Sequence, residues 1–302
     1  MKGFFQKIFS TSSNPVNDQE TRPVPQDLVE TPAEPVYASA LNPPQLLAVC
    51  AQSVGLQRDH NEDAMFALTT TLTTDHTNLP FGLYIVADGM GGHQHGEVAS
   101  GIAARSMASY IINKLFAPLL SVKPITPEDS LQEIMQSGVQ EAHRAITRQV
   151  PGGGTTLTAV LILGEQMVIA HVGDSRAYAI SPDGKMETLT RDHSLVRRLE
   201  ELGQISHEEA ANHPQRNVLY RALGQGEPFD PDVKSMRLPD EGYLLLCSDG
   251  LWGVVPESEL SQLITNTNRL DHTCQALVDS ANAAGGPDNI TAILIRLPGP
   301  LS

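Results

Sequence analysis

Short runs of apolar and β-branched residues recur from Leu46 to about Leu297, and most of them are too short to form a helix. Runs of this length, bounded by Gly, Pro, Asn or Asp, are typical of β-strands. The strands predicted in this way span residues 46–54, 64–70, 82–87, 155–163, 166–172, 176–180, 243–247 and 290–296. Several strands follow one another closely, which favours antiparallel pairing over a regular alternation of parallel strands and helices.

Three stretches have the periodicity of amphipathic helices instead. Residues 96–116 place apolar side chains at every fourth position, namely at Ala99, Ala103, Met107, Ile111 and Leu115. A second apolar stripe runs over 131–146, with a predicted helix start at Thr126 and a stop at Pro151. A third helix, at about 270–284, is expected to end at the Gly-Gly-Pro that follows it.

The chain divides into a polar N-terminal part and one globular domain. Residues 1–45 are rich in Pro, Ser, Thr, Asn and acids, so we expect a disordered tail or linker there. The sustained apolar pattern predicts a single domain over 46–297, built from two antiparallel sheets packed together with helices outside. Residues 190–230 are more polar, with helical patterns at 194–203 and 217–224, and are expected to form an insertion beside the core.

Composition and charge narrow the possible functions. With 40% hydrophobic and 18% charged residues, the chain has the composition of an ordinary soluble globular protein. Its net charge of −15 argues against nucleic-acid binding, which needs a basic surface. No apolar run approaches the roughly 20 residues of a membrane span, so we expect no integral membrane segment. The three widely spaced cysteines suggest no disulfide framework, which favours a reducing cytoplasm.

Candidate chemistry lies where acidic residues stand at the ends of predicted strands. The acids in this setting are Glu62, Asp63, Asp88, Asp174, Asp249 and Asp288. One such acid is usually a turn residue, but packed strands can bring several to one rim. Carboxylates gathered there raise one another's pKa unless cations neutralise them, and all-oxygen ligation favours Mg²⁺ or Mn²⁺. Arg58, nearby in the sequence, has the fork geometry that suits a phosphate.

Other kinds of site fit the sequence less well. From Gly89 the GxGxxG dinucleotide pattern fails at Gln94, and no GxxxxGK[ST] phosphate loop occurs. A zinc site at His93 and His95 lacks a second His/Cys cluster. A cysteine-based phosphatase would need CxxxxxR, and no cysteine has an arginine six residues later. Cys50 and Cys247 are therefore interpreted as buried core thiols.

Eight stretches together carry a family resemblance. In chain order they are RDHNED (58–63), VADGMGGHQHGEVAS (86–100), GTTLTAV (154–160), HVGDSRAY (171–178), LTRDHSLVRRL (189–199), HPQRNVLYRALG (213–224), LCSDGLW (246–252) and GGPDNITAIL (285–294). They resemble the bacterial branch of the metal-dependent protein phosphatase family, type 2C (PPM), which hydrolyses phosphoserine and phosphothreonine. The resemblance covers about 46–297 and implies an α+β fold, a four-layer α-β-β-α sandwich of two antiparallel sheets flanked by helices.

The resemblance also implies a set of metal ligands. Asp88 would bridge two Mn²⁺ or Mg²⁺ ions, and the backbone carbonyl of Gly89 would bind one of them. Asp249 and Asp288 match the other direct ligands of this dinuclear centre. Asp174 matches an additional ligand for a third, weaker ion that it would share with Asp249. Which of the two metals is used stays open, because both accept the same ligands.

Further residues match supporting positions of the family pattern. Glu62 and Asp63 match acids that hold metal-bound waters, with Asp63 the nearer to a direct role. Arg58 matches the arginine that binds the substrate phosphate, and Asn289 is expected to support the centre from behind the ligands. Residues 190–230 match the variable flap beside the catalytic cleft, a place for substrate selection. The residues expected to carry catalysis are Arg58, Asp88 and Asp249.

The function implied is that of a protein serine/threonine phosphatase in which a metal-bridging water attacks phosphorus directly. Its partners would be phosphorylated proteins made by a Ser/Thr kinase, and it would act in signalling as a cytoplasmic monomer. Met90 stands where some eukaryotic members have a histidine proposed as general acid, so that role has no obvious holder. An inactive phosphoprotein-binding adaptor on the same fold is the alternative. Such proteins usually lose metal-binding acids, which are retained here, and the enzyme is therefore favoured.

Overall fold

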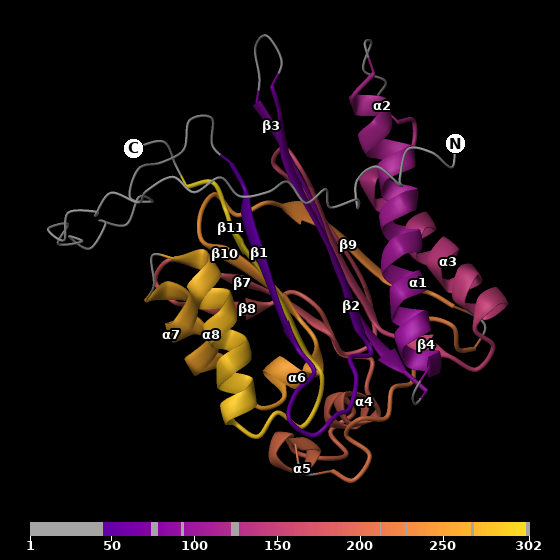
Figure 1. Ribbon diagram of the computed structural model, residues 1–302, viewed down its shortest axis with the longest axis vertical. Helices are drawn as coiled ribbons and strands as arrows, with labels where there is room; N and C mark the ends of the chain where they lie inside the picture. The colour runs from indigo at the N-terminus through magenta and orange to yellow at the C-terminus, as the bar shows by residue number, and fades with distance from the viewer. Residues whose placement is uncertain are drawn as a thin grey trace, which may run out of the picture. The chain divides into compact units, whose positions relative to one another are not determined.

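Two antiparallel β-sheets pack face to face between two layers of helices (Figure 1). The computed structural model describes residues 45–73, 78–91, 94–121, 127–211, 213–226, 229–266 and 269–299, which all belong to one structural unit. The tail predicted over 1–45 lies outside the described residues, apart from Gln45. The fold class predicted from the sequence is confirmed.

Each sheet is antiparallel throughout. The first sheet has the order β1 (Leu47–Ser53), β11 (Ile290–Arg296), β10 (Tyr243–Cys247), β7 (Arg176–Ile180) and β8 (Met186–Thr188). The second has the order β2 (Asp63–Thr73), β3 (Asn78–Met90), β5 (Leu157–Leu163), β6 (Gln166–Val172) and β9 (Asp232–Arg237). The short strand β4 (Gly154–Thr155) pairs with the end of β3.

Helices cover the outer face of each sheet and one end of the sandwich. The second sheet is covered by α1 (Gln94–Ile111), which continues through a π-helical turn (Ile112–Phe116) into α2 (Ala117–Leu119), and by α3 (Leu131–Gln149). The first sheet is covered by α7 (Glu257–Thr265) and α8 (Leu270–Ala283). The short helices α4 (Leu195–Glu201), α5 (His207–Ala211) and α6 (Asp249–Trp252) lie at the lower end in Figure 1.

The four layers follow from alternation of side chains along the strands. Tyr84, Val86 and Val160 of the second sheet meet Leu246 and Ile293 of the first in the inner core. The intervening residues of the same strands point outward and pack against the helices, so both faces of each central strand are apolar. Burial on both faces explains why these strands read as continuous apolar runs in the sequence.

The structure contains the predicted helices, with two corrections. The helix expected from Thr126 begins only at Leu131, where the Ser130 hydroxyl and the Glu133 carboxylate form a capping box; Thr126 lies outside the described residues. Residues 217–224 form no helix, because Leu219 and Leu223 make isolated bridges to Ser194 and Thr155 instead. Backbone pairing with distant segments has replaced the local helical pattern there.

The β9 strand was missed in the sequence for a physical reason. It lies at the edge of its sheet and pairs only with β6 among the described strands. Four of its six residues are exposed, so it shows neither an apolar run nor a strong alternation. An exposed edge strand is not buried, so it lacks the apolar pattern by which strands are predicted from a sequence.

Candidate metal and phosphate site

Acidic residues converge at the lower end of both sheets. Asp88 stands near the end of β3, directly opposite Asp63 at the start of β2. Asp249 follows β10, Asp288 precedes β11, and Asp174 lies in the turn between β6 and β7. Because antiparallel strands alternate in direction, the end of one strand and the start of its neighbour share an edge. The structure thereby brings together the acids that the sequence singled out.

Asp63 is held by two hydroxyl groups and leaves one oxygen without a partner. Its Oδ2 accepts hydrogen bonds from Ser248 Oγ at 2.7 Å and from Thr291 Oγ1 at 2.6 Å. Its Oδ1 is buried and has no hydrogen-bond partner among the described residues. Burial raises the pKa of Asp63 to about 7, against the opposing effect of the two hydroxyls.

Asp88 is fixed through its backbone, and its side chain points toward the other acids. Its N–H donates to Thr156 Oγ1 at 2.9 Å, and its carbonyl accepts from Thr155 Oγ1 at 2.8 Å. Burial raises the pKa of the Asp88 carboxyl well above its ordinary value, and the charges of Asp63 and Asp249 raise it further. The end of β3 therefore carries an acid whose ionisation is disfavoured unless a positive charge is bound nearby.

The ionisation of Asp249 and Asp174 is also disfavoured, because their pKa values are raised. Burial, followed by the charge of Asp288, raises the pKa of Asp249 to about 6, although a hydrogen bond with the Asp88 carboxyl lowers it. Burial and the charge of Asp249 raise the pKa of Asp174 well above its usual range. The Oδ1 atom of Asp249 is buried without a hydrogen-bond partner within the described ranges.

These carboxylates fit divalent cations. Within the part of the chain that the structure describes, no three acidic, His or Cys side chains already surround one point as a finished ligand set. Buried, unpartnered carboxylate oxygens on Asp63 and Asp249 are nevertheless costly in a protein without a counter-charge. Mutual repulsion of the neighbouring acids adds to that cost. Hard oxygen donors of this kind suit Mg²⁺ or Mn²⁺.

Arg58 lies at the rim of the acidic cluster. Its Nη2 donates to Asp288 Oδ2 at 2.7 Å, and half of its side chain is exposed. This hydrogen bond raises the pKa of the Arg58 guanidinium above its ordinary value. The remaining N–H groups of the fork stay available for a ligand with oxygen atoms.

Asn289 ties the loop that carries Arg58 to the rest of the site. Its Nδ2 donates to the carbonyls of Val54 at 2.8 Å and His60 at 2.9 Å. Its Oδ1 accepts the N–H of Glu62 at 2.8 Å. The supporting position predicted for Asn289 thus corresponds to a fully bonded amide between two loops. Glu62 itself points toward His60, with Oε1 and Nε2 3.0 Å apart.

Gly89 lies where the backbone of three segments meets. A Cβ atom on this residue would contact the carbonyl of Gly96 in α1 and would lie 2.6 Å from the Glu62 carbonyl oxygen. Only glycine allows this approach of β3 to the start of α1 and to the β2 loop.

We expect Gly89→Ala to lower the free energy of unfolding by about 2–4 kcal/mol, because backbone atoms rather than a flexible side chain must move. Urea denaturation of the two proteins would measure the loss. Gly299→Ala is the control for added volume alone, since a Cβ there meets nothing within 4 Å. An unchanged midpoint for Gly89→Ala would contradict this close backbone packing around Gly89.

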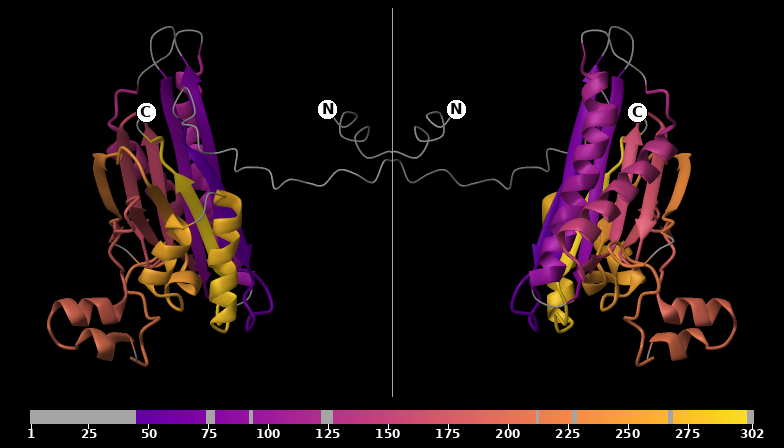
Figure 2. Two further views of the ribbon diagram at one scale, coloured as in Figure 1. Left: turned by 90° about the vertical axis from the view of Figure 1, so that its left-hand side faces the viewer. Right: turned by 90° about the vertical axis from the view of Figure 1, so that its right-hand side faces the viewer.

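A cleft of about 750 Å³ leads from the acids toward the insertion. Arg58, Asp174, Asp249 and Asp288 line one end of it, and residues of α4, α5 and the following turn line the other. Figure 2 shows α4 and α5 projecting from the lower end of the sandwich. The insertion predicted over 190–230 therefore borders the cleft.

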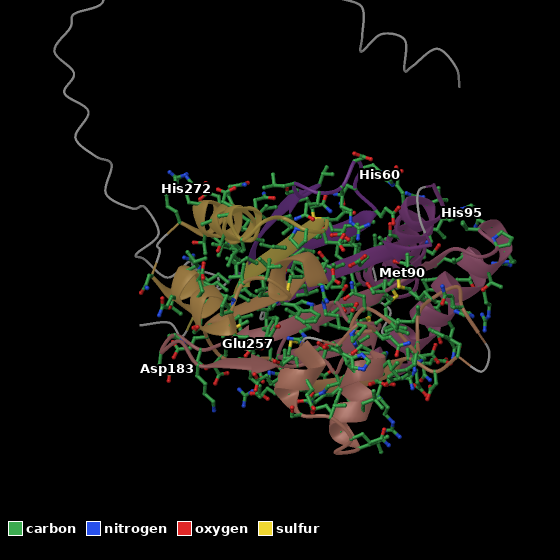
Figure 3. All side chains as sticks on the ribbon, turned by 90° about the horizontal axis from the view of Figure 1, so that it is seen from below. His60, Met90, His95, Asp183, Glu257 and His272 are labelled. Carbon is green, nitrogen blue, oxygen red and sulfur yellow. The ribbon has the colours of Figure 1, made fainter. Side chains whose placement is uncertain are left out.

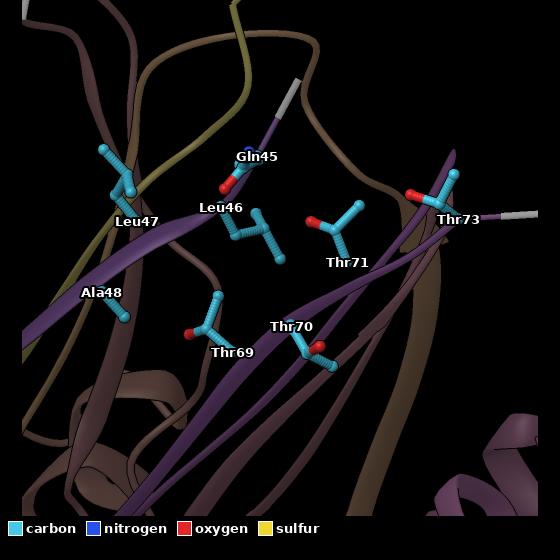
Figure 4. A pocket seen from close by; sticks show the side chains of 8 residues that line it. All are labelled: Gln45, Leu46, Leu47, Ala48, Thr69, Thr70, Thr71 and Thr73. Atoms are coloured by element: carbon cyan, nitrogen blue, oxygen red, sulfur yellow. The ribbon is translucent and has the colours of Figure 1, made fainter. Parts of the chain in front are cut away.

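A second hollow, of about 580 Å³, lies at the opposite end of the sandwich (Figure 4). It is lined by Gln45, Leu46, Leu47, Ala48, Thr69, Thr70, Thr71 and Thr73. These lining residues carry neither a charge nor a nucleophilic thiol. The acids lie at the other end, so this hollow is unrelated to the candidate site.

Four further residues that the sequence analysis considered have no contact with the acidic cluster assigned to them, or lie outside the described residues. His93 lies outside the described residues. Met90 is the last residue of β3 and His95 lies in the first turn of α1, both on the side of the molecule away from Asp183 and His272 (Figure 3). Cys50 was wrongly expected to be buried: it is exposed on the edge strand β1, whereas Cys247 and Cys274 are buried free thiols.

Several hydroxyl residues of the site were not singled out from the sequence. Ser248 and Thr291 hold Asp63, and Thr155 and Thr156 hold the backbone of Asp88. A hydroxyl residue is common in any chain and gives no signal by itself. All four nonetheless stand inside the motifs CSDG, DNIT and GTT, so adjacency to the acids was the available clue.

Comparison with known proteins identifies the family. The family model of protein phosphatase 2C matches residues 48–290. The chain belongs to this family. As a protein phosphatase 2C it is 40% identical over 216 residues to the serine/threonine phosphatase stp of Listeria innocua, which covers 71% of this chain and 84% of that relative.

Solved protein phosphatase 2C structures share the fold. The serine/threonine phosphatase PstP/Ppp of Mycobacterium tuberculosis superposes with a TM-score of 0.71 at 31% identity, covering 84% of this chain and 99% of that one. The catalytic domain of a phosphatase PstP in complex with two manganese ions superposes with a TM-score of 0.69 at 29% identity, covering 84% and 98%. The relatives are therefore matched over nearly their whole length.

Proposed function

We propose that this protein phosphatase 2C hydrolyses phosphoserine and phosphothreonine in proteins at the acidic end of the sandwich. Asp88, Asp249 and Asp288, with the carbonyl of Gly89, would hold two Mn²⁺ or Mg²⁺ ions. Asp174 would hold a third, weaker ion, and Asp63 would support the centre with Glu62. The observation that carries this proposal is the gathering of buried acids, two of which, Asp63 and Asp249, each have a buried carboxylate oxygen without a partner among the described residues.

The bound ions would neutralise the carboxylates and lower the pKa of a water for direct attack on phosphorus. The chain's own residues would prepare the site for this. Ser248 and Thr291 keep one oxygen of Asp63 turned away, so that the unpartnered Oδ1 is left for the centre. The hydroxyls of Thr155 and Thr156 hold the backbone at Asp88, which limits how far its carboxylate can move.

Arg58 would bind the substrate phosphate. Its guanidinium lines the cleft, next to Asp288, and keeps unused N–H donors after bonding that carboxylate. A planar fork of this kind binds two phosphate oxygens at once and so fixes the orientation of the phosphate. Asn289 supports this role because it bonds both ends of the loop that carries Arg58.

The insertion would select among phosphoproteins, since α4 and α5 border the cleft into which a substrate must reach. We further propose that the protein acts in signalling, in the cytoplasm, as a monomer that opposes a Ser/Thr kinase. Its three cysteines are free thiols, which suits a reducing compartment. None of the helices in the described ranges is both long and apolar enough to cross a membrane.

Hydrolysis of p-nitrophenyl phosphate and of a phosphothreonine peptide tests the proposal. We expect both substrates to be hydrolysed with Mn²⁺, and the activity to vanish with excess EDTA and return when Mn²⁺ is restored. Phosphate release from the peptide should proceed without a phosphorylated enzyme, which mass spectrometry of the protein can check. Equal rates with Mn²⁺ and EDTA would rule out this function.

A further inference from the structure

His193 is a buried histidine at the base of the insertion, and it binds the backbone just before Asp174. Its backbone N–H donates to the Gly173 carbonyl at 2.7 Å, and the Gly173 N–H donates to the ring Nδ1 of His193 at 3.1 Å. The side chain is 1% exposed. One residue therefore binds both the amide and the carbonyl of Gly173.

The bond from Gly173 determines which ring nitrogen carries the proton. A backbone N–H can only donate, so Nδ1 of His193 must accept and the proton must lie on Nε2. Nε2 lies 3.2 Å from Asp232 Oδ2, to which it donates. Arg221 Nη1 also lies 3.4 Å from Nε2, but it cannot accept a proton and donates to Asp232 Oδ1 at the shorter distance of 2.8 Å, so Nε2 has Asp232 as its acceptor. Asp232, at the start of β9, thus favours the tautomer that Gly173 requires.

The far side of Asp174 is fixed as well. Trp252 of α6 donates from Nε1 to the Asp174 carbonyl at 3.0 Å. The Arg176 guanidinium lies 3.5 Å from the centroid of that indole ring and forms a two-pronged pair with Asp192, the neighbour of His193. The backbone of Asp174 is consequently held between the base of the insertion and α6.

Gly173 has no side chain that could anchor this part of the backbone, and only glycine suits its conformation. Its φ of +106° is a conformation that side chains disfavour, and a Cβ atom there would lie 2.6 Å from Thr156 Cβ. Because glycine leaves the backbone conformationally free, bonds from other segments help to define where Asp174 points. The imidazole of His193 supplies that bond from a segment 20 residues away.

We propose that His193 is a positioning residue that holds the carboxylate of Asp174 in place for its metal ion, and that Asp232 fixes the ring in the tautomer that does so. Because His193 belongs to the insertion, any shift of the insertion is passed to Asp174 through Gly173. The inference rests on the proposed function, in which Asp174 holds the weaker third ion. Outer partners of this kind typically change metal affinity by about 10–100-fold.

Two substitutions of His193 by an amide residue distinguish the role of Nδ1 from the role of Nε2. The oxygen of Asn can occupy the place of Nδ1 and still accept from Gly173, whereas the amide of Gln reaches the place of Nε2 and meets only Asp232. Mn²⁺ binding by titration calorimetry is the main readout, with thermal unfolding in EDTA as a measure of folding. Leu202→Ala is the control within the insertion, because Leu202 is 55% exposed at the end of α4.

We expect His193→Gln to weaken the weakest Mn²⁺ site about 10-fold and His193→Asn to stay within about 3-fold of the wild type. Asp232→Ala should weaken the same site. If His193→Gln does not fold, the Mn²⁺ affinity of Asp232→Ala is compared with that of the wild type instead. Equal Mn²⁺ affinities in the Gln variant, the Asp232 variant and the wild type would overturn the inference. So would an equal loss in the Gln and Asn variants.

Hydrolysis of p-nitrophenyl phosphate by the same samples separates this inference from the proposed function. If the wild type hydrolyses the substrate with Mn²⁺ while the variants bind Mn²⁺ as it does, only the role of His193 is lost. If the wild type neither binds Mn²⁺ nor hydrolyses the substrate, the proposed function fails and the inference fails with it.

Discussion

Asp249→Asn is expected to reduce Mn²⁺-dependent hydrolysis at least about 100-fold while the protein stays folded. Replacing this carboxylate removes a proposed metal ligand and about 3 kcal/mol or more of charge stabilisation in the transition state. The amide of Asn can keep the hydrogen bond that Asp249 shares with Asp88, so the packing should persist. Steady-state kinetics with a phosphothreonine peptide would measure the loss.

The matched control is Asp183→Asn, the same chemical change at an exposed acid in the turn between β7 and β8, at the end of β7 opposite to Asp174. It should keep wild-type activity. In EDTA, Asp249→Asn should unfold at a temperature equal to or above that of the wild type, because one of the repelling buried charges is gone. Retained activity of Asp249→Asn, with folding intact, would remove Asp249 from the catalytic centre.

Without metal, the protein is expected to become less stable as the pH rises from about 6 to about 8. The pKa of Asp63 is raised to about 7, whereas an unfolded chain has an ordinary Asp pKa near 4. Between these values the folded state binds more protons than the unfolded state, so the free energy of unfolding falls with increasing pH. The loss over this range should be about 1–2 kcal/mol, or roughly 3–6 °C in Tm.

The buried His171 has the opposite effect, but at lower pH. Burial lowers its pKa to about 4, so it adds stability as the pH rises to about 6.5 and little beyond that. The interval from pH 6 to 8 therefore reports mainly on the acids.

Calorimetric scans in EDTA and in Mn²⁺ would test this trend. Mn²⁺ should raise the Tm and flatten its dependence on pH, since the ions compensate the ionised carboxylates. Asp63→Asn should flatten the dependence in EDTA without metal, whereas Asp183→Asn should follow the wild type. A Tm that rises with pH over this range in EDTA would show that the acids ionise without penalty.

The strand patterns and the motifs predicted the fold class, which is confirmed, and the acids that the structure brings to one end of the sandwich. Continuous apolar runs such as 155–163 are readable because strands covered on both faces need apolar residues at every position. Acid-glycine pairs such as Asp88–Gly89 and Asp249–Gly250 at the ends of such runs indicated the end of the sandwich at which we propose the active site. These signals are local, because each depends on neighbouring residues in one segment.

The sequence could not provide what depends on contacts between distant segments. The edge strand β9 and the bridged turn around Leu219–Leu223 owe their conformation to partners far away in the chain. Ser248 and Thr291 matter because they meet Asp63 across about 185 and 228 intervening positions. Nothing local marks one hydroxyl as a hydrogen-bond donor to an acid on another strand.

The sequence by itself thus determined a two-sheet sandwich and the acids that lie at one end of it. Only the tertiary structure decided how those acids are held: which oxygens lack partners, which carboxyls repel one another, and that His193 reaches back to the backbone before Asp174. The reason is physical. Strand formation follows from the local alternation of apolar residues, whereas the pKa of a carboxyl depends on charges and burial that folding brings together.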